Sequence, residues 1–474
     1  MKKGFLRSLL SDSFIYGVSG VIASFISIFL IPLYTRVFEP ADYGVISILT
    51  TSSAFLNILL IFSLDNSAAV WFWDKTDQKE REVTFNTWIV FLGICGLFLM
   101  LLIVLFSGPL SYLFFESSAY KSLFVLIGLN LLFVGFQKVV NIWCRMLRKP
   151  VLAMVYSLLI MVSTVICNVF FILYLKLGVR GVFYSQLIAG FIGFILLIVF
   201  FRRWINPMLF SQDRLKAMLH FSLPLVPATL LYWIMNMASI YFIKLFVNDN
   251  AEIGLYQVGA SVANILSLCT WAFFQAWTPL ALEVSKNENA PSIYSQVFKW
   301  YCFLGFTFAF LLLFFAKDIL IVFTREAYLG AWQVIGLLGI NVIVLGIPNI
   351  LAIANAIVKK NRSYAIAMGI GAIVTVGLFF VLIPMFGKEG AVFSMIIGNL
   401  TMCIVLGYKT QKLFYIPYDF ISIIFFNGFS ALVFIGLLQF EISFFQKIII
   451  SMIMLLFFGV QVYKSFKGKV TVSN

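Results

Sequence analysis

Long runs of uncharged, apolar residues limit what this chain can fold into, and the first run shows why. No residue between Asp12 and Arg36 is charged. A helix rises ~1.5 Å per residue, so about 20 residues cross the hydrocarbon core of a bilayer. A second apolar run starts at Gly44, after a polar corner over 35–43. Together they predict a transmembrane helical hairpin with its corner at the membrane surface.

Such runs recur along all 474 residues, of which 62% are hydrophobic and 11% charged. Soluble proteins carry about 25% charged residues, and the strands of a membrane barrel are short and alternating. We therefore predict an all-α polytopic membrane protein without a soluble domain. The fourteen predicted spans are 13–34, 44–65, 86–108, 122–144, 151–175, 181–201, 219–245, 253–282, 298–316, 331–357, 364–386, 391–408, 420–438 and 446–463.

Lysine and arginine are spread unevenly over the predicted loops. With a cytoplasmic N-terminus, 23 of the 33 basic residues fall on the cytoplasmic side and nine on the outer side. Cytoplasmic loops of membrane proteins are enriched in such residues. This distribution predicts that both termini are cytoplasmic. It also accounts for the net charge of +14 without a nucleic-acid partner.

Two short motifs recur at a nearly constant distance. Ala41–Gly44 (ADYG) is followed 210 residues later by Ala251–Gly254 (AEIG), again between two apolar runs. Gly178–Gly181 (GVRG) is followed 209 residues later by Gly387–Gly390 (GKEG). Ordered matches at one offset indicate two copies of a six-helix unit. Because six is even, both copies enter the membrane from the same side.

The repeat predicts three parts of the chain: an N-lobe of helices 1–6 over 1–201, a C-lobe of helices 7–12 over 202–408, and two further helices with a cytoplasmic tail over 409–474. In transporters with parallel repeats, the substrate passes between the two halves. We expect the same of this chain.

A charge within the fourth span is the most informative polar residue. A lysine in the middle of a bilayer costs ~2.5–3.5 kcal/mol on insertion scales. At ~100° per residue, Lys138 shares a helix face with Asn130, Asn141 and Arg145. Snorkelling of Lys138 toward the cytoplasmic face is the alternative, but it does not explain the two asparagines. We predict that this face lines a polar cavity.

Other candidates for the substrate path come from three spans. Asp65 is the one acid well inside an apolar run; it either pairs with Lys138 or Arg145 or meets cytoplasmic water. The remaining candidates are Asn57 in the second span, Tyr232 and Asn236 in the seventh, and Arg36 and Lys244 at the outer ends of the first and seventh. Inter-helix hydrogen bonding is the alternative for the seventh span, and interfacial anchoring for the two basic residues.

No pattern in the chain indicates catalysis or a cofactor. There is a single histidine, and no glycine-rich phosphate loop precedes a helix, so neither a histidine metal site nor ATP binding is predicted. The six cysteines all fall in apolar runs and show no metal-ligand spacing. We expect a protein that is not an enzyme and holds no cofactor.

The first hairpin resembles that of a known family. Ile31–Arg36 (IPLYTR) followed by Pro40–Gly44 (PADYG) is similar to bacterial polysaccharide flippases. These are the Wzx-type transporters of the multidrug/oligosaccharidyl-lipid/polysaccharide exporter superfamily. The resemblance implies a V-shaped, two-lobed protein of the bacterial inner membrane. It also implies export of undecaprenyl-pyrophosphate-linked oligosaccharides for O-antigen, capsule or exopolysaccharide. Its partners would be that lipid-linked substrate, membrane lipids and polysaccharide-assembly proteins.

Two other functions remain open from the sequence. A multidrug or small-molecule antiporter of the same fold usually carries buried acids in one lobe, and here Asp65 is the one candidate. A membrane polymerase or ligase would need a long outer loop with catalytic residues. The longest outer stretches, near 109–121 and 317–330, are short and poor in acid–base groups.

The topology can be tested with cysteine labelling or reporter fusions. Sites at Glu116, Arg180, Lys388 and Glu441 are expected to report the outer side, because the distribution of basic residues puts both termini in the cytoplasm. Cytoplasmic signals from two or more of these sites would overturn the predicted orientation.

Overall fold

The computed structural model describes residues 30–74, 77–285, 287–358, 362–437, 440 and 442–453. Within these ranges the chain is helical and contains no strand. Ten described helices are long and apolar enough to cross a membrane, and two shorter apolar helices follow. This confirms the predicted all-α polytopic class. Most of the first predicted span, 13–34, lies outside the described residues, so the number fourteen stays a prediction.

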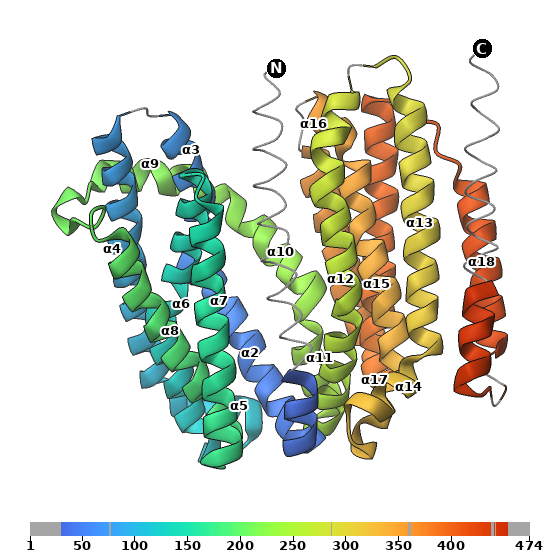
Figure 1. Cartoon of the computed structure of the whole chain (residues 1–474), viewed down its shortest axis with the longest axis horizontal. Coiled ribbons are helices and arrows are strands. Elements are labelled where there is room, and N and C mark those ends of the chain that lie inside the picture. The colour runs from blue at the N-terminus through green and yellow to red at the C-terminus, as the bar shows by residue number, and fades with distance from the viewer. Residues whose placement is uncertain are drawn as a thin grey trace. The chain divides into compact units, whose positions relative to one another are not determined.

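Figure 1 shows the path of the chain through its helices. The α-helices are α2 (Pro40–Ile61), α3 (Leu64–Asp74), α4 (Gln78–Leu105), α5 (Ser107–Phe115), α6 (Lys121–Met146), α7 (Pro150–Asn168), α8 (Val179–Phe201), α9 (Gln212–Ser222), α10 (Val226–Met237), α11 (Ser239–Val247), α12 (Asn250–Val284), α13 (Ala290–Phe314), α14 (Ala316–Phe323), α15 (Trp332–Leu351), α16 (Ile353–Val358), α17 (Arg362–Leu413) and α18 (Phe420–Leu437). Shorter turns are η1 (Ser118–Tyr120), η2 (Val169–Tyr174), η3 (Pro207–Leu209), η4 (Leu223–Leu225) and η5 (Glu326–Ala331).

Local sequence explains where several helices begin. Glu39 is the N-cap residue of α2, and Pro40 follows at the first helical position, where its missing N–H costs nothing. The Ser211 hydroxyl caps α9 by accepting a hydrogen bond from the Arg214 backbone N–H at 3.2 Å. Acidic residues in the first turns, such as Asp42 in α2, interact favourably with the positive end of the helix dipole.

The chain divides into two compact units. The first unit extends to Gln257 and also includes Phe379–Gly387. It therefore continues beyond residue 201, where the predicted N-lobe ends. Within it, α6 packs against α4 and α8, and α7 packs against α8 (Figure 1). Aromatic side chains such as Trp88 and Trp143 fill the core between these helices and are fully buried. The three-part division predicted from the repeat stays a prediction.

The second unit contains Val258–Leu378 and the chain from Lys388 onward. There α13 packs against α15 and α18, and the aromatic rings of Phe310, Phe314 and Phe434 form part of the contact. Two ion pairs strengthen this attachment of the C-terminal helices. Lys299 Nζ lies 2.8 Å from Asp419 Oδ2, and Lys447 Nζ lies 2.5 Å from Asp318 Oδ2.

The seventh predicted span, 219–245, is not one continuous helix. It is built from the end of α9, the turn η4, α10 and α11. Pro224 lies in η4 and Pro227 in the first turn of α10, where each ring removes a backbone donor. The two prolines account for the break at the start of α10.

The recurring glycine corner has the same backbone geometry at both places. Gly178 has φ 58° and ψ −141°, and Gly387 has φ 55° and ψ −130°. Such angles are open almost exclusively to glycine. Seven residues on, the buried Ser185 and Ser394 hydroxyls each donate 2.7 Å to the carbonyl four residues earlier. These matched details support an internal repeat at the level of local structure.

The other recurring motif brings two helices into backbone contact within the first unit. A Cβ added at Gly44 would lie 1.9 Å from the Asn250 carbonyl oxygen. A Cβ at Gly254 would lie 1.9 Å from the Pro40 carbonyl oxygen. The contact is reciprocal, because each glycine meets the first residue of the other helix. Small residues at such crossings let helix backbones approach closely.

Replacing either glycine with alanine is therefore expected to destabilise the protein. Gly44→Ala or Gly254→Ala must push the two backbones apart, an overpacking cost of about 1–3 kcal/mol. The measurement is unfolding of the purified protein in detergent. Gly377→Ala is the control, since nothing lies within 4 Å of its added Cβ. Equal stability of all three variants would contradict the close crossing.

Candidate functional site

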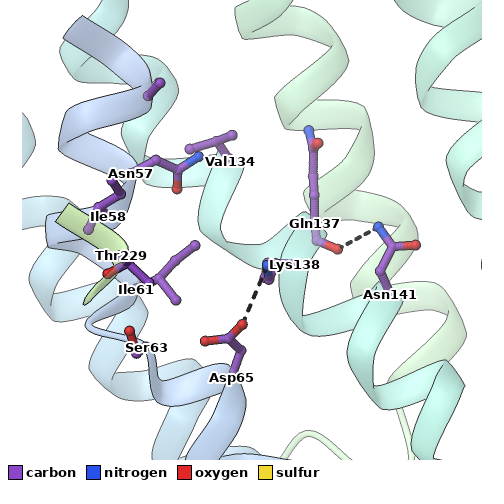
Figure 2. A pocket seen from close by; sticks show the side chains of 11 residues that line it. Asn57, Ile58, Ile61, Ser63, Asp65, Val134, Gln137, Lys138, Asn141 and Thr229 are labelled. Carbon is purple, nitrogen blue, oxygen red and sulfur yellow. Dashed lines mark hydrogen bonds and ion pairs between the residues drawn. The ribbon is translucent and has the colours of Figure 1, made fainter. Parts of the chain in front are cut away.

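A polar cavity of about 470 Å³ lies in the first unit (Figure 2). Its walls come from α2, α3, α6 and one residue of α10, together with Ser63 between α2 and α3. The lining residues are Ala54, Asn57, Ile58, Ile61, Ser63, Asp65, Val134, Gln137, Lys138, Asn141 and Thr229. Four of these side chains are aliphatic and seven are polar or charged, and the volume falls in the range of small-molecule sites.

Two of the lining residues form an ion pair. Lys138 Nζ of α6 lies 3.4 Å from Asp65 Oδ2 of α3, and Figure 2 marks this contact with a dashed line. The Lys138 side chain is 48% exposed, whereas that of Asp65 is 18% exposed. Of the two alternatives open for Asp65 from the sequence, the structure shows pairing with Lys138. The pair offsets the cost of a charged lysine at this depth.

A break in a membrane helix places Asp65 at the cavity. Helix α2 ends at Ile61 and α3 starts at Leu64, with Phe62 and Ser63 in the left-handed region at φ 50° and 54°. This conformation costs roughly 1–2 kcal/mol for each residue that has a side chain. Irregular backbone is tolerated at membrane depth where it borders a polar cavity. The break puts Asp65 in the first turn of α3, where the helix dipole favours a carboxylate.

Side-chain amides provide most of the remaining polar lining. Asn141 Nδ2 donates to the Gln137 carbonyl at 3.1 Å, and Asn141 Oδ1 accepts from Ser157 Oγ at 3.1 Å. Within the described part of the chain, Asn57 Oδ1 is buried and has no hydrogen-bond partner. An unpaired buried amide oxygen is costly, so Asn57 has unused capacity to accept a hydrogen bond. Four of the predicted site residues, Asn57, Asp65, Lys138 and Asn141, thus meet in one cavity.

Three predicted residues lie on helices that line this cavity but are not among its lining residues. Arg145 is exposed in the last turn of α6, seven residues after Lys138. Tyr232 and Asn236 follow Thr229 on α10. Tyr232 is 50% exposed, and its carbonyl accepts a 2.7 Å hydrogen bond from Asn236 Nδ2. Through Thr229, α10 reaches the cavity, but these two residues sit farther along the helix.

The last two predicted residues belong to the polar corners at the other end of this unit. Arg36 is exposed, directly after the buried Thr35. Lys244 Nζ donates to Asn250 Oδ1 at 3.1 Å, and Asn248 Nδ2 donates to Glu116 Oε1 at 3.3 Å. Lys244 therefore stabilises the start of α12, beside the Gly44–Gly254 crossing. The structure does not bring Arg36 or Lys244 into the cavity.

Gln137 and Ser63 were absent from the sequence-predicted site. Gln137 stands four residues before Asn141, at the edge of the predicted face, and it lines the cavity. Ser63 reaches the cavity because of the helix break at Phe62 and Ser63, which contains neither glycine nor proline. The i, i+4 spacing between Gln137 and Asn141 was the signal for Gln137 in the sequence. No residue pattern near Phe62 and Ser63 predicted the helix break.

Sequence comparison assigns the chain to a family. A profile of the family described as "Polysaccharide biosynthesis protein" matches residues 33–279, just over half of the chain. The chain belongs to this family, which confirms the relationship predicted from Ile31–Gly44. A search of curated proteins finds no match.

Solved structures of transporters share the fold. Lipid II flippase MurJ, in an inward closed conformation, has a TM-score of 0.75 at 13% identity, covering 96% of this chain and 99% of that one. An inward-facing multidrug resistance MATE family transporter has a TM-score of 0.65 at 15% identity, covering 86% and 97%. A point mutant of a MATE protein has a TM-score of 0.63 at 16% identity, covering 86% and 95%. These neighbours are transporters rather than enzymes, and the likeness defines the fold.

The strength of the Asp65–Lys138 pair can be measured with a double-mutant cycle. Because half of the Lys138 side chain is exposed, we expect a coupling free energy of about 0.2–1 kcal/mol between Asp65→Asn and Lys138→Met. The measurement is unfolding of the purified single and double variants in detergent. Asp318 and Lys447, 24% and 14% exposed, form the reference pair, for which stronger coupling is expected. Coupling above about 3 kcal/mol at Asp65 and Lys138 would show a buried, structural ion pair instead.

Proposed function

We propose that this protein flips undecaprenyl-pyrophosphate-linked oligosaccharides from the cytoplasmic to the outer leaflet of the bacterial inner membrane. The units would serve synthesis of a surface polysaccharide: O-antigen, capsule or exopolysaccharide. The observation that carries the proposal is the cavity, in which a lysine from a candidate membrane span lies among amides and hydroxyls. Membership of a polysaccharide biosynthesis family and a fold shared with a lipid II flippase support it.

The chemistry of the cavity fits the two ends of such a cargo. A sugar cannot cross bare hydrocarbon, because its hydroxyls need hydrogen-bond partners. Asn57, Gln137, Asn141 and Thr229 supply donors and acceptors of this kind. The pyrophosphate needs a cation, and the Lys138 ammonium offers one with half of its side chain exposed. The lipid tail can remain in the bilayer.

Basic residues outside the cavity extend the same idea. Arg145, one of the exposed residues of α6, would attract the pyrophosphate from the cytoplasmic side, since its guanidinium suits phosphate oxygens. Arg36 and Lys244 would meet it near the outer mouth, and Tyr232 and Asn236 would line the path on α10. In this proposal both termini are cytoplasmic and the two repeats alternate access.

In the proposed transport cycle, the Gly44–Gly254 crossing would close the outer side of the protein. In the proposed orientation, it joins the outer ends of α2 and α12. Backbones this close leave no room for a sugar, so cargo in the cavity would be closed off from the outer side there. Release would require these two helix ends to separate. Lys244 and Asn250 lie beside the crossing, where they would have to adjust with it.

A multidrug antiporter is the second candidate, favoured by the structural likeness to MATE transporters. Asp65 would then be the ion-binding acid. A cation that binds Asp65 must compete with Lys138, which already lies 3.4 Å away. This arrangement favours anionic cargo over cation coupling, and we therefore place the flippase first.

Charge reversal at the cavity tests the proposed function. In cells that lack the chromosomal copy, Lys138→Glu and Arg145→Glu are expected to reduce surface polysaccharide about tenfold or more, because they repel the pyrophosphate. Lys138→Arg keeps the cation and should retain more export than Lys138→Ala. Lipid-linked units should accumulate in the inner leaflet, and antibody detection should show normal amounts of each variant in the membrane.

Lys121→Glu is the matched control, since this exposed residue lies at the opposite end of the same helix. It should leave export unchanged. Normal export by both Lys138→Glu and Arg145→Glu would rule out a cationic path through these residues.

A further inference from the structure

Charge balance within the cavity raises a question about Asp65. Among the described residues that line the cavity, Lys138 is the one cation and Asp65 the one anion. An entering anion therefore meets a lysine whose charge is already neutralised. It is also repelled by the carboxylate beside that lysine. A cavity that binds phosphate has to resolve this conflict.

The geometry of the pair shows how the conflict can be resolved. The Nζ–Oδ2 distance of 3.4 Å is longer than the ~2.7–2.9 Å of a strong charge-assisted hydrogen bond. One carboxylate oxygen makes the contact, and half of the Lys138 side chain remains exposed. An ion pair of this kind is weak enough to be exchanged for another anion.

A second interaction, which does not depend on Lys138, also stabilises the Asp65 carboxylate. It lies in the first turn of α3, where the helix dipole favours a negative charge. The break at Phe62 and Ser63 separates α3 from α2, so a small change at these two residues re-aims the carboxylate. Asp65 therefore keeps a stabilising interaction with the α3 N-terminus after Lys138 turns away from it.

We infer that Asp65 is an internal counter-ion that occupies Lys138 in the unloaded cavity and is displaced when the phosphate of the cargo binds. This inference rests on the proposed function and adds a way in which the protein selects its cargo. The empty cavity keeps its lysine paired within the membrane, and cargo binds by exchanging one anion for another. A cargo without a strong anionic group cannot displace Asp65, so the same residue selects for phosphate.

Binding of inorganic pyrophosphate to the purified protein in lipid nanodiscs tests the exchange. Asp65→Asn removes the competing anion and is expected to tighten binding about tenfold in calorimetric titration, as expected for the loss of one nearby like charge. Asp65→Glu retains a carboxylate and should bind like the unmodified protein. Asp318→Asn, which makes the same change in net charge at an ion pair outside the cavity, should also leave binding unchanged.

The outcomes separate this inference from the proposed function. Tighter binding by Asp65→Asn that disappears in the Asp65→Asn/Lys138→Met double variant supports the exchange. Weaker or equal binding by a folded Asp65→Asn protein, with loss of binding in Lys138→Met, overturns the counter-ion role and leaves the flippase proposal intact. Undiminished binding by Lys138→Met overturns both.

Discussion

Hydrocarbon offers no hydrogen bonds, and the rest of this structure depends on that constraint. Each membrane-spanning segment satisfies its backbone internally by forming a helix. Where a helix breaks, as between α2 and α3, the freed groups need a polar neighbourhood. That break borders the cavity, where Asp65 and Lys138 meet. The lack of hydrogen-bond partners in hydrocarbon thus accounts for both the regular helices and the position of the break between α2 and α3.

The Asp65–Lys138 pair connects the stability of the protein to its proposed transport cycle. A lone lysine at this depth is expensive, and a strongly bound pair would be inert. The contact lies between these extremes, because half of the Lys138 side chain is exposed and exposed ion pairs are weak. A weak pair keeps the empty cavity stable while leaving the cation available to a stronger anion. In the proposed cycle, the same ion pair would therefore serve both folding and selection of cargo.

Backbone geometry explains why glycines stand at matching positions of the predicted repeat. Gly178 and Gly387 share a backbone conformation that side chains exclude. Gly44 and Gly254 cross so closely that neither tolerates a Cβ without movement. In each case a backbone requirement, conformation or proximity, preserves the residue type in both copies. The motifs that revealed the repeat in the sequence are thus explained by backbone geometry.

The sequence by itself determined the helical membrane class, the family and two of the four residues by which α6 lines the cavity, Lys138 and Asn141. Hydrophobic runs and helical periodicity are local properties, so the face that carries Lys138 and Asn141 could be predicted from spacing alone. Only the tertiary structure decided which acid pairs with Lys138, that Arg145, Tyr232 and Asn236 lie outside the cavity, and that Ser63 and Gln137 line it. The physical reason is that a helix break without glycine or proline, and the approach of α3 and α10 to α6, depend on packing between segments far apart in the chain. No local pattern encodes those distances.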